Sequence, residues 1–247
     1  MISVIIPTRN AESTLERTLA CLVPAAIEGL VRQVIVADGG SDDRTITIAE
    51  DAGADIVHAA PGRGQQLIAG ASEARHPWLL FLHADTELAA DWAMAAVAFI
   101  DEVGRGQRPQ SAAAFRFHLD DSGVWPRLVE RGVALRCRMF GLAYGDQGLL
   151  ISRALYDRIG GYQPIALMED VDLVRRLGKE RLTILKATAT TSAARYREGG
   201  YARRIVRNGL CLSLYGFGAA PDRIARIYER RGDATPPHPA ERARGKA

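Results

Sequence analysis

The chain has 247 residues, 47% hydrophobic and 25% charged, with a formal net charge of +3, as is ordinary for a folded globular protein. Its three cysteines, Cys21, Cys137 and Cys211, are far apart and odd in number, which argues against a disulfide framework and favours a reducing compartment. No secretory or transit signal and no run long enough to span a bilayer is visible, so we expect a cytoplasmic protein.

The first hundred residues alternate short β-rich runs with helical patterns. This alternation is typical of βαβ units and predicts an α/β fold with a mainly parallel central sheet flanked by helices. In chain order, the predicted strands are 2–6, 33–37, 56–57 and 78–82, and the helices between them lie near residues 15–22, 44–51 and 65–74.

The second hundred residues are less regular. We predict helices at 92–103, 127–139, 153–159 and from Glu169, strands at 112–118, 149–152 and 182–187, and a surface loop at 104–110. These elements predict one domain over residues 1–190, with one half at about 1–103 and another at about 112–190. A basic, partly apolar helical extension would follow at 191–232, and a disordered tail at 233–247.

Three acidic turns carry the functional prediction. Asp38 and Asp85 each follow an apolar run that reads as a buried strand, so both should lie at the carboxyl edge of the sheet, where ligands bind in open α/β folds. The third turn is Glu169-Asp170, at the start of a predicted helix. Carboxylates in these places suit a sugar nucleotide, because one can bind base or ribose, another a metal on the diphosphate, and the third a proton.

The turn after residue 37 reads Asp38-Gly39-Gly40-Ser41. Helix capping accounts for Ser41 and the acids after it, but not for Asp38, which we assign to the nucleotide. Pro7-Thr8-Arg9-Asn10 closes the first strand with a tight turn that either faces a ligand or simply caps a helix through Asn10.

Two further segments are candidates for the donor site. Gly62-Arg63-Gly64-Gln65-Gln66 lacks the third glycine of a dinucleotide fingerprint, but a basic loop there would present Arg63 and Gln66 to a base or diphosphate. His83-Ala84-Asp85 offers Asp85 as a metal ligand. His83 is either a second ligand, which Mn²⁺ accepts more readily than Mg²⁺, or a histidine packed beside the site.

The remaining candidates concern the acceptor. Glu169 and Asp170 are paired carboxylates, which raise each other's pKa as suits a general base, although acids in a first helical turn are often only dipole partners. Gly145, Asp146 and Gln147 form a polar turn predicted to line an acceptor pocket.

In this order, the motifs resemble those of the family 2 inverting glycosyltransferases with the GT-A fold. The resemblance covers roughly residues 1–190 and involves 7–10, 38–45, 63–71, 81–86, 145–148 and 169–170. It implies a hexosyltransferase-like enzyme with a nucleoside-diphosphate sugar donor, of the UDP or GDP type, and Mg²⁺ or Mn²⁺. It assigns Asp38 to the base, Asp85 to metal and diphosphate, and Asp170 to deprotonation of the acceptor. Pro7, Thr8, Asn10, Arg63, Gln66 and Ala84 complete the implied donor site. The resemblance further implies a nucleotide-binding half at about 1–103 and an acceptor half at about 112–190.

One departure from the family pattern concerns the metal motif. The common motif has an acid two residues before its final Asp, and this chain has His83 there, a His-Ala-Asp-Thr form similar to that of a small bacterial subgroup. Two alternatives to a transferase stay open: a non-catalytic nucleotide-sugar-binding module, and a sugar nucleotidyltransferase, whose glycine-rich, Lys-containing signature the sequence lacks.

The carboxyl-terminal region differs in charge from the rest. Residues 1–194 carry 20 Lys and Arg against 24 Asp and Glu, whereas residues 195–247 carry 12 against 5. Basic residues beside the apolar segment 210–220 indicate either a peripheral membrane contact through 200–226, at the inner face of the plasma membrane, or a helix buried against the domain or a partner in a homodimer. The predicted partners are therefore a nucleotide-sugar donor, an unidentified acceptor and one of these surfaces, with no nucleic acid.

Overall fold

The computed structural model describes residues 1–165 and 167–229, and its core is one eight-stranded sheet with the order β3-β2-β1-β4-β7-β6-β8-β5. The strands are β1 Ile2–Thr8, β2 Val31–Asp38, β3 Asp55–His58, β4 Trp78–Phe81, β5 Thr86–Leu88, β6 Ala112–Leu119, β7 Leu149–Ser152 and β8 Leu182–Thr191. Every strand expected from the sequence is present, and β5 is an additional one.

The two halves of the sheet are paired differently. In the first half, β1 lies parallel to β2 and β4, and β2 lies parallel to β3, as βαβ connections require. In the second half, β7 is antiparallel to both β4 and β6, β6 is parallel to β8, and β5 is antiparallel to β8. The α/β prediction is confirmed, with a parallel first half of the sheet continued by a mixed second half.

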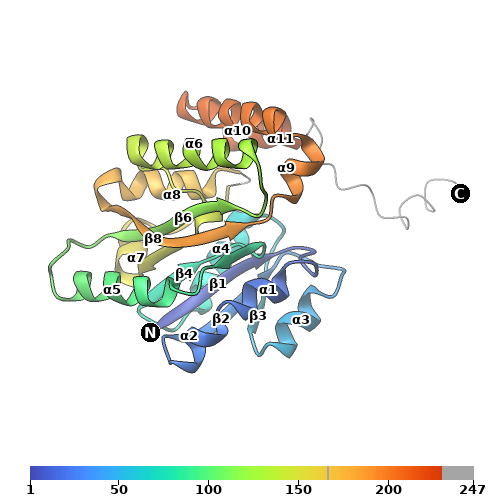
Figure 1. The fold of residues 1–247 in the computed structure, drawn as a ribbon. Helices are drawn as coiled ribbons and strands as arrows, with labels where there is room; N and C mark the ends of the chain where they lie inside the picture. Colours follow the sequence, from blue (N-terminus) through green and yellow to red (C-terminus); the bar gives the residue numbers. More distant parts are fainter. Residues whose placement is uncertain (166, 230–247) are drawn as a thin grey trace, which may run out of the picture.

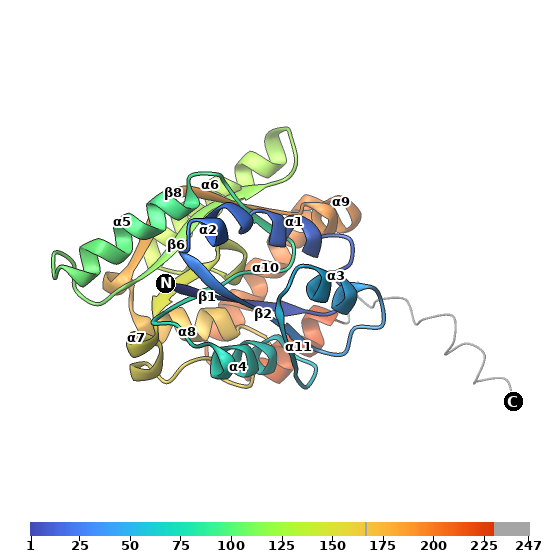
Figure 2. The same cartoon turned by 90° about the horizontal axis from the view of Figure 1, so that it is seen from below.

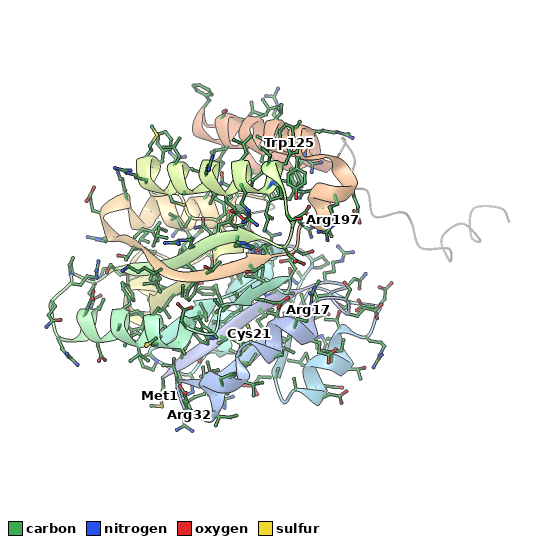
Figure 3. The ribbon with its side chains drawn as sticks, in the orientation of Figure 1. Met1, Arg17, Cys21, Arg32, Trp125 and Arg197 are labelled. Carbon is green, nitrogen blue, oxygen red and sulfur yellow. The ribbon has the colours of Figure 1, made fainter. Side chains whose placement is uncertain are left out.

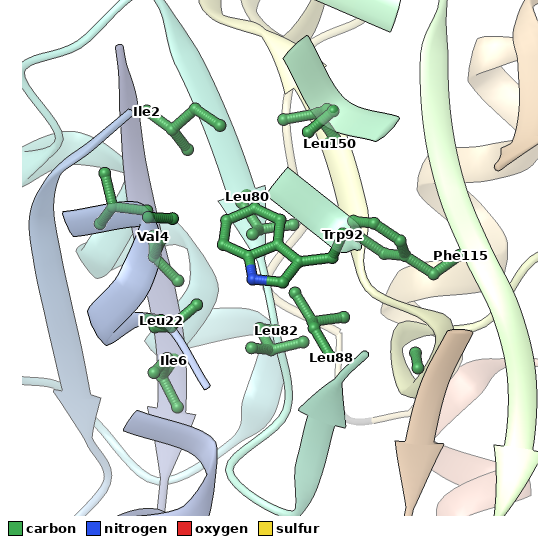
Figure 4. Packing of buried hydrophobic residues seen from close by; sticks show 14 of the residues in the cluster. Ile2, Val4, Ile6, Leu22, Leu80, Leu82, Leu88, Trp92, Phe115 and Leu150 are labelled. Carbon is green, nitrogen blue, oxygen red and sulfur yellow. The ribbon is translucent and has the colours of Figure 1, made fainter. Parts of the chain in front are cut away.

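Helices cover both faces of this sheet (Figures 1 and 2). On one face lie α1 Leu15–Ala20, α2 Val23–Ile27, α3 Thr45–Asp51 and α5 Trp92–Gly104. The alternation of β1 sends Ile2, Val4 and Ile6 toward this face, where Trp92 packs at the centre of the cluster (Figure 4). The ring of Trp92 meets Phe115 edge to face at 6.3 Å between centroids, which links the two halves of the sheet.

The opposite face is covered by α4 Arg63–Glu73, α7 Arg153–Arg158 and α8 Glu169–Leu177. Ile5 and Ile35 point to this side and pack with Leu67 of α4 and Leu173 of α8. Helix α4 lies very close to β1, because a Cβ on Gly70 would come within 2.5 Å of the Ile5 side chain. The glycine therefore sets the depth at which α4, and with it Arg63, sits on the sheet.

A third cluster joins helix α6, Val124–Phe140, to β6. The chain then adds α9 Ala194–Gly199, α10 Tyr201–Gly216 and α11 Pro221–Glu229, and α10 packs against α6 and α11 (Figure 1). Two short 3-10 helices, η1 Gly145–Gln147 and η2 Lys179–Arg181, complete the elements.

Some expected boundaries were wrong. The first predicted helix is divided into α1 and α2 with Pro24 in the first turn of the second, as proline prefers. The last strand extends to Thr191, and residues 210–216 belong to α10 rather than to a separate apolar segment. No helix within residues 1–165 and 167–229 has the length and apolarity needed to cross a bilayer. The predicted tail at 233–247 lies outside the described residues.

Candidate active site

A cleft opens where β1 and β4 end, and it has two connected compartments. The β1 compartment, about 460 Å³, is bounded by residues 7–14 and the start of α4. The α8 compartment, about 190 Å³, is bounded by Tyr144, Asp146, the start of α8 and residues of α10 and α11. Both are lined by Arg63, His83, Asp85, Leu167, Glu169, Ser192 and Arg195. The shared residues make this one cleft with two ends.

The floor of the β1 compartment is a pair of interlocked loops. Asn10 adopts a left-handed conformation with φ 52°, which asparagine tolerates better than most residues. Its backbone N–H donates to Ser41 Oγ at 2.9 Å, and its side-chain oxygen accepts the Asp42 N–H at 3.0 Å. The loops after β1 and β2 are therefore fixed to each other before any ligand binds.

Asp38 holds these two loops together through hydrogen bonds to its buried carboxylate. It is 2% exposed, and its carboxylate accepts four hydrogen bonds: from Thr8 Oγ1, from Ser41 Oγ and from the backbone N–H groups of Gly40 and Ser41. Burial acts to raise the pKa of Asp38, but these donors outweigh it and the pKa is lowered. Asp38 lies behind Thr8 rather than on the cleft surface, so its assignment to the base stays a prediction. Ser41 serves Asp38 and does not cap α3.

Gln66 has a similar internal role. It is 5% exposed, and its amide N–H₂ donates to the carbonyls of Thr8 and Ala37, at 2.5 and 3.1 Å. The segment predicted as a basic loop is instead the first turn of α4, which begins at Arg63. Gln66 lines the β1 compartment while tying α4 to the ends of β1 and β2.

Arg63 stands between the two compartments and pairs with Glu169, Nη1 to Oε1 at 3.2 Å. Burial acts to lower the pKa of Arg63, but Glu169, followed by Asp170 and Asp85, raises it overall. Glu169 is 1% exposed, and burial raises its pKa. The guanidinium of Arg63 opposes this rise, and the neighbouring Asp170 adds to it. Three carboxylates thus surround one arginine.

The turn His83-Ala84-Asp85 is held by backbone hydrogen bonds. Thr18 Oγ1 donates to the Ala84 carbonyl at 3.0 Å, and the Ser192 N–H donates to the Asp85 carbonyl at 3.2 Å. The Asp85 carboxylate makes no hydrogen bond to any described residue and faces both compartments. Burial, followed by Arg63 and Arg195, lowers the pKa of His83 well below its ordinary value, so this imidazole is neutral near pH 7.

Gly145 packs directly on this histidine. A Cβ at Gly145 would lie 2.3 Å from His83 Nε2, so only glycine allows the approach. The Gly145 N–H donates to Asp170 Oδ2 at 2.8 Å, while Asp170 Oδ1 accepts its neighbour's N–H, from Val171, at 2.7 Å. The Gly145–Gln147 turn therefore connects His83 to Asp170 and fixes the orientation of the Asp170 carboxylate in the α8 compartment.

Asp146 and Gln147, adjacent in sequence, point in opposite directions. Asp146 lines the α8 compartment, its buried Oδ1 has no hydrogen-bond partner among the described residues, and burial raises its pKa to about 6, opposed by Arg136 and supported by Asp170 and Asp85. Gln147 is 1% exposed and donates to the Phe115 carbonyl at 3.0 Å, away from the cleft. Gln147 holds the turn, and the acceptor role predicted for it has no support in this position.

The far wall of the cleft comes from residues that the motifs do not include. Arg195 lies between the compartments, and Asn208, Cys211 and Tyr228 line the α8 compartment. Arg204, 6% exposed, donates to Tyr228 Oη at 3.0 Å. The basic clustering after residue 194 is the one signal for this wall in the sequence, and it predicts either a membrane contact or a helix buried against the domain or a partner.

The family model described as glycosyl transferase family 2 matches residues 3–120, just under half of the chain. The matched segment contains the loops after β1 and β2, the start of α4 and the Asp85 turn, while the Gly145–Gln147 turn and α8 follow it in the chain.

Solved structures show that the likeness of fold extends beyond the matched segment. TarS from S. aureus, residues 1–349, has a TM-score of 0.60 at 17% identity, with 78% of this chain and 60% of that chain covered. Mannosyl-3-phosphoglycerate synthase from Rubrobacter xylanophilus gives 0.58 at 18%, covering 89% and 75%. Glucosyl-3-phosphoglycerate synthase from Mycobacterium tuberculosis, with Mn²⁺, UDP and glucosyl-3-phosphoglycerate, gives 0.53 at 20%, covering 85% and 78%.

The chain has the GT-A fold that the resemblance implied. It spans 60% of the TarS 1–349 structure and 38% of a longer TarS structure. No curated protein matches it by sequence.

Proposed function

We propose that this chain is a family 2 glycosyltransferase and moves a sugar from a nucleoside-diphosphate sugar in the β1 compartment to an acceptor hydroxyl in the α8 compartment, with inversion at the anomeric carbon. The observation that carries the proposal is the meeting of Asp85 and Asp170, 85 residues apart in sequence, on one cleft that Arg63 divides. The proposal extends to the site roles given above, except that of Gln147, whose side chain points away from the cleft.

The residues that line the β1 compartment support its assignment to the nucleotide sugar. The β1 compartment is lined by Pro7, Thr8, Asn10 and Ala84, and Arg63 and Arg195 stand at its junction with the α8 compartment. Guanidinium groups at that junction suit the diphosphate, which must lie beside the bond that breaks. The glucosyl-3-phosphoglycerate synthase structure of the same fold contains Mn²⁺ and UDP, which favours a UDP-type donor here over a GDP-type one.

A divalent metal fits the residues at the junction. Asp85 has a carboxylate without a hydrogen bond to the described residues, and His83 is neutral, as a metal ligand must be. No group of three or more His, Cys, Asp or Glu side chains in the described part of the chain is arranged to hold a metal. Asp85, with His83 as the second candidate, would therefore hold a metal whose other ligands are diphosphate oxygens and water, and Mn²⁺ suits an imidazole better than Mg²⁺ does. When bound, the metal would neutralise charge on the leaving diphosphate.

Asp170 is the better placed of the two paired acids to act as general base. Glu169 is 1% exposed and held by Arg63, whereas Asp170 lines the α8 compartment and is oriented by the N–H groups of Gly145 and Val171. In the proposed reaction Asp170 accepts the hydroxyl proton as the acceptor oxygen attacks the anomeric carbon, and the nucleoside diphosphate leaves from the opposite side. One displacement inverts that carbon.

The test begins with binding. A thermal-shift panel of uridine and guanosine diphosphates and their sugars, with and without Mn²⁺, should give a metal-dependent stabilisation by one nucleotide, lost in Asp85→Asn. Hydrolysis of that nucleotide sugar should then depend on Asp85 and, in transfer to an acceptor, on Asp170. A product of retained anomeric configuration would refute the single displacement.

The two alternatives have distinct results. A binding module would bind the donor without ever hydrolysing or transferring the sugar. A sugar nucleotidyltransferase would release pyrophosphate from a nucleoside triphosphate and a sugar phosphate, which the proposed transferase does not do.

A further inference from the structure

Helices α6 and α10 present an unusual outer surface. On α6 the side chains of Trp125, Leu128, Leu135 and Met139 are 51–57% exposed, and they recur at the three- and four-residue spacing of one helical stripe. On α10 Val206 is 70% exposed and Leu210 is 42% exposed, and Phe217, at its C-cap, is 92% exposed. We call this surface the α6/α10 face.

The two stripes lie on helices that touch. Helix α10 packs against α6, and Trp125 lies at the upper edge of the molecule (Figures 1 and 3). The core side of α6 is a separate row, Val129, Val133 and Cys137, packed on β6. An apolar stripe opposite the buried row is unexpected for a helix that faces only water, and it marks a surface that meets an apolar phase.

The charges around the stripe are almost all positive. Residues 124–140 contain four Arg and one Glu, and residues 201–216 contain three Arg and no acid. The single acid, Glu130, already accepts hydrogen bonds from Arg127 at 2.5 and 2.6 Å. Arg131 and Arg138 are exposed and make no ion pair with any residue the structure describes.

A groove beside α6 continues this positive border. Its volume is about 760 Å³, and its cationic side chains are Arg116, Arg131, Arg138 and Lys179, from α6, β6 and η2. Phe117, Val133, Leu182 and Ile184 form an apolar wall in the same groove. A hollow with several cations over an apolar wall suits the phosphate and upper acyl region of an anionic lipid.

A second copy of the chain is a poor occupant for this face. A two-fold dimer would place the face against itself and gather two copies of Arg131, Arg138, Arg116 and Lys179 in one interface. The exposed aromatic side chains Trp125, Phe140 and Phe217 instead suit the interface between headgroups and acyl chains.

We propose that the α6/α10 face docks the protein on an anionic phospholipid bilayer, with lipid phosphates in the groove lined by Arg116, Arg131, Arg138 and Lys179. The apolar stripe enters the interfacial layer, and the arginines beside it reach the headgroup phosphates. The sequence had placed a membrane contact within 200–226 alone, whereas the structure adds α6 and the groove. The inference does not depend on the proposed transfer reaction, because lipid binding is measured without donor or acceptor.

The experiment is co-sedimentation of the full chain with vesicles of pure phosphatidylcholine and of phosphatidylcholine with phosphatidylglycerol. Binding is expected only to the anionic vesicles and should weaken as salt is raised. Arg131→Glu with Arg138→Glu should reduce the partition coefficient roughly tenfold or more, since each basic side chain near the surface favours binding. Leu135→Ser with Met139→Ser should reduce it as well.

Matched controls separate this face from general charge and apolarity. Arg44→Glu with Arg158→Glu changes the net charge equally, at exposed arginines of α3 and α7 that form no ion pair with the residues described, and should leave binding unchanged. Met94→Ser with Val97→Ser removes exposed apolar side chains from α5 and should also have no effect. Unchanged melting temperatures confirm that each variant folds.

Three results would overturn the proposal. One is no binding of the wild type to anionic vesicles. Another is an equal loss in the α6 variants and their controls. The third is a stable dimer by light scattering that Leu135→Ser with Met139→Ser dissociates, which would make the face a protein interface instead.

Discussion

Replacing Asp146 by asparagine should make the protein more stable at neutral pH while impairing transfer. The wild-type carboxylate has a buried oxygen without a partner among the described residues, and burial raises its pKa from 3.8 to about 6. A folded state that binds the proton more tightly than the unfolded state loses stability as pH rises from about 3.8 to about 6 and stays at the lower value above it.

The magnitude follows from the shift. The rise of the Asp146 pKa from 3.8 to about 6 corresponds to a loss of about 3 kcal/mol in the unfolding free energy of the wild type above pH 6. Asp146→Asn removes the ionisation, so its gain at pH 8 should approach about 3 kcal/mol as an upper bound. Near pH 4, where the folded wild type is protonated, the gain should nearly disappear.

The assay is urea denaturation of the wild type and Asp146→Asn at pH 4, 6 and 8. Asp157→Asn, on the exposed side of α7, is the matched control and should stay within about 0.5 kcal/mol at every pH. Equal or lower stability of Asp146→Asn at pH 8, or a gain that persists at pH 4, would refute the reasoning. A stable variant with reduced transfer would indicate that this buried charge is retained for the acceptor.

Three further outcomes are expected. Arg63→Met should lower the unfolding free energy by about 1–2 kcal/mol, because Glu169 stays buried without its cation; the value allows for the partly exposed guanidinium. Adding Glu169→Gln should restore most of this loss, and no restoration in urea denaturation would show that the ion pair is not the cause. Gly145→Ala should displace His83 and abolish the Mn²⁺-dependent stabilisation by nucleotide while the protein stays folded. The control Gly132→Ala, on α6 with open space around it, should keep that stabilisation, and metal dependence retained in Gly145→Ala would exclude a role for His83. Asp38→Asn should destabilise the protein by about 1–3 kcal/mol at pH 7. Because the pKa of Asp38 is lowered in the folded state, the stability difference between wild type and variant should shrink as pH falls below 3.8, and a difference that stays constant with pH in thermal melts would contradict this.

The parallel half of the fold was predictable because each of its strands is a short apolar run followed by polar turn residues. The runs ending at Asp38 and before His83 placed two acids at one sheet edge, and the structure brings their loops together. The short strand β5 has no such run, since it holds only Thr86–Leu88 and exists through its pairing with β8.

Side-chain direction was harder to predict than position. Asp146 and Gln147 are neighbours in one polar turn, and nothing local indicates that one faces the cleft while the other bonds to the Phe115 carbonyl. The same holds for Asp38, whose carboxylate is satisfied by its own loop. Arg195 and Tyr228 reach the cleft through the packing of α9–α11, a long-range contact with no local periodicity.

Helices α9, α10 and α11, which follow β8, contribute side chains to the α8 compartment, so the carboxyl-terminal region is part of the proposed active site. A chain shortened to end after Thr191 would keep the residues of the sheet, the Asp85 turn and α8, and with them most of the proposed nucleotide site. It would lack the side chains that, in the proposed reaction, limit the access of bulk solvent to the anomeric carbon. Such a fragment should hydrolyse its nucleotide sugar rather than transfer the sugar, and the ratio of hydrolysis to transfer would measure how well these helices exclude water.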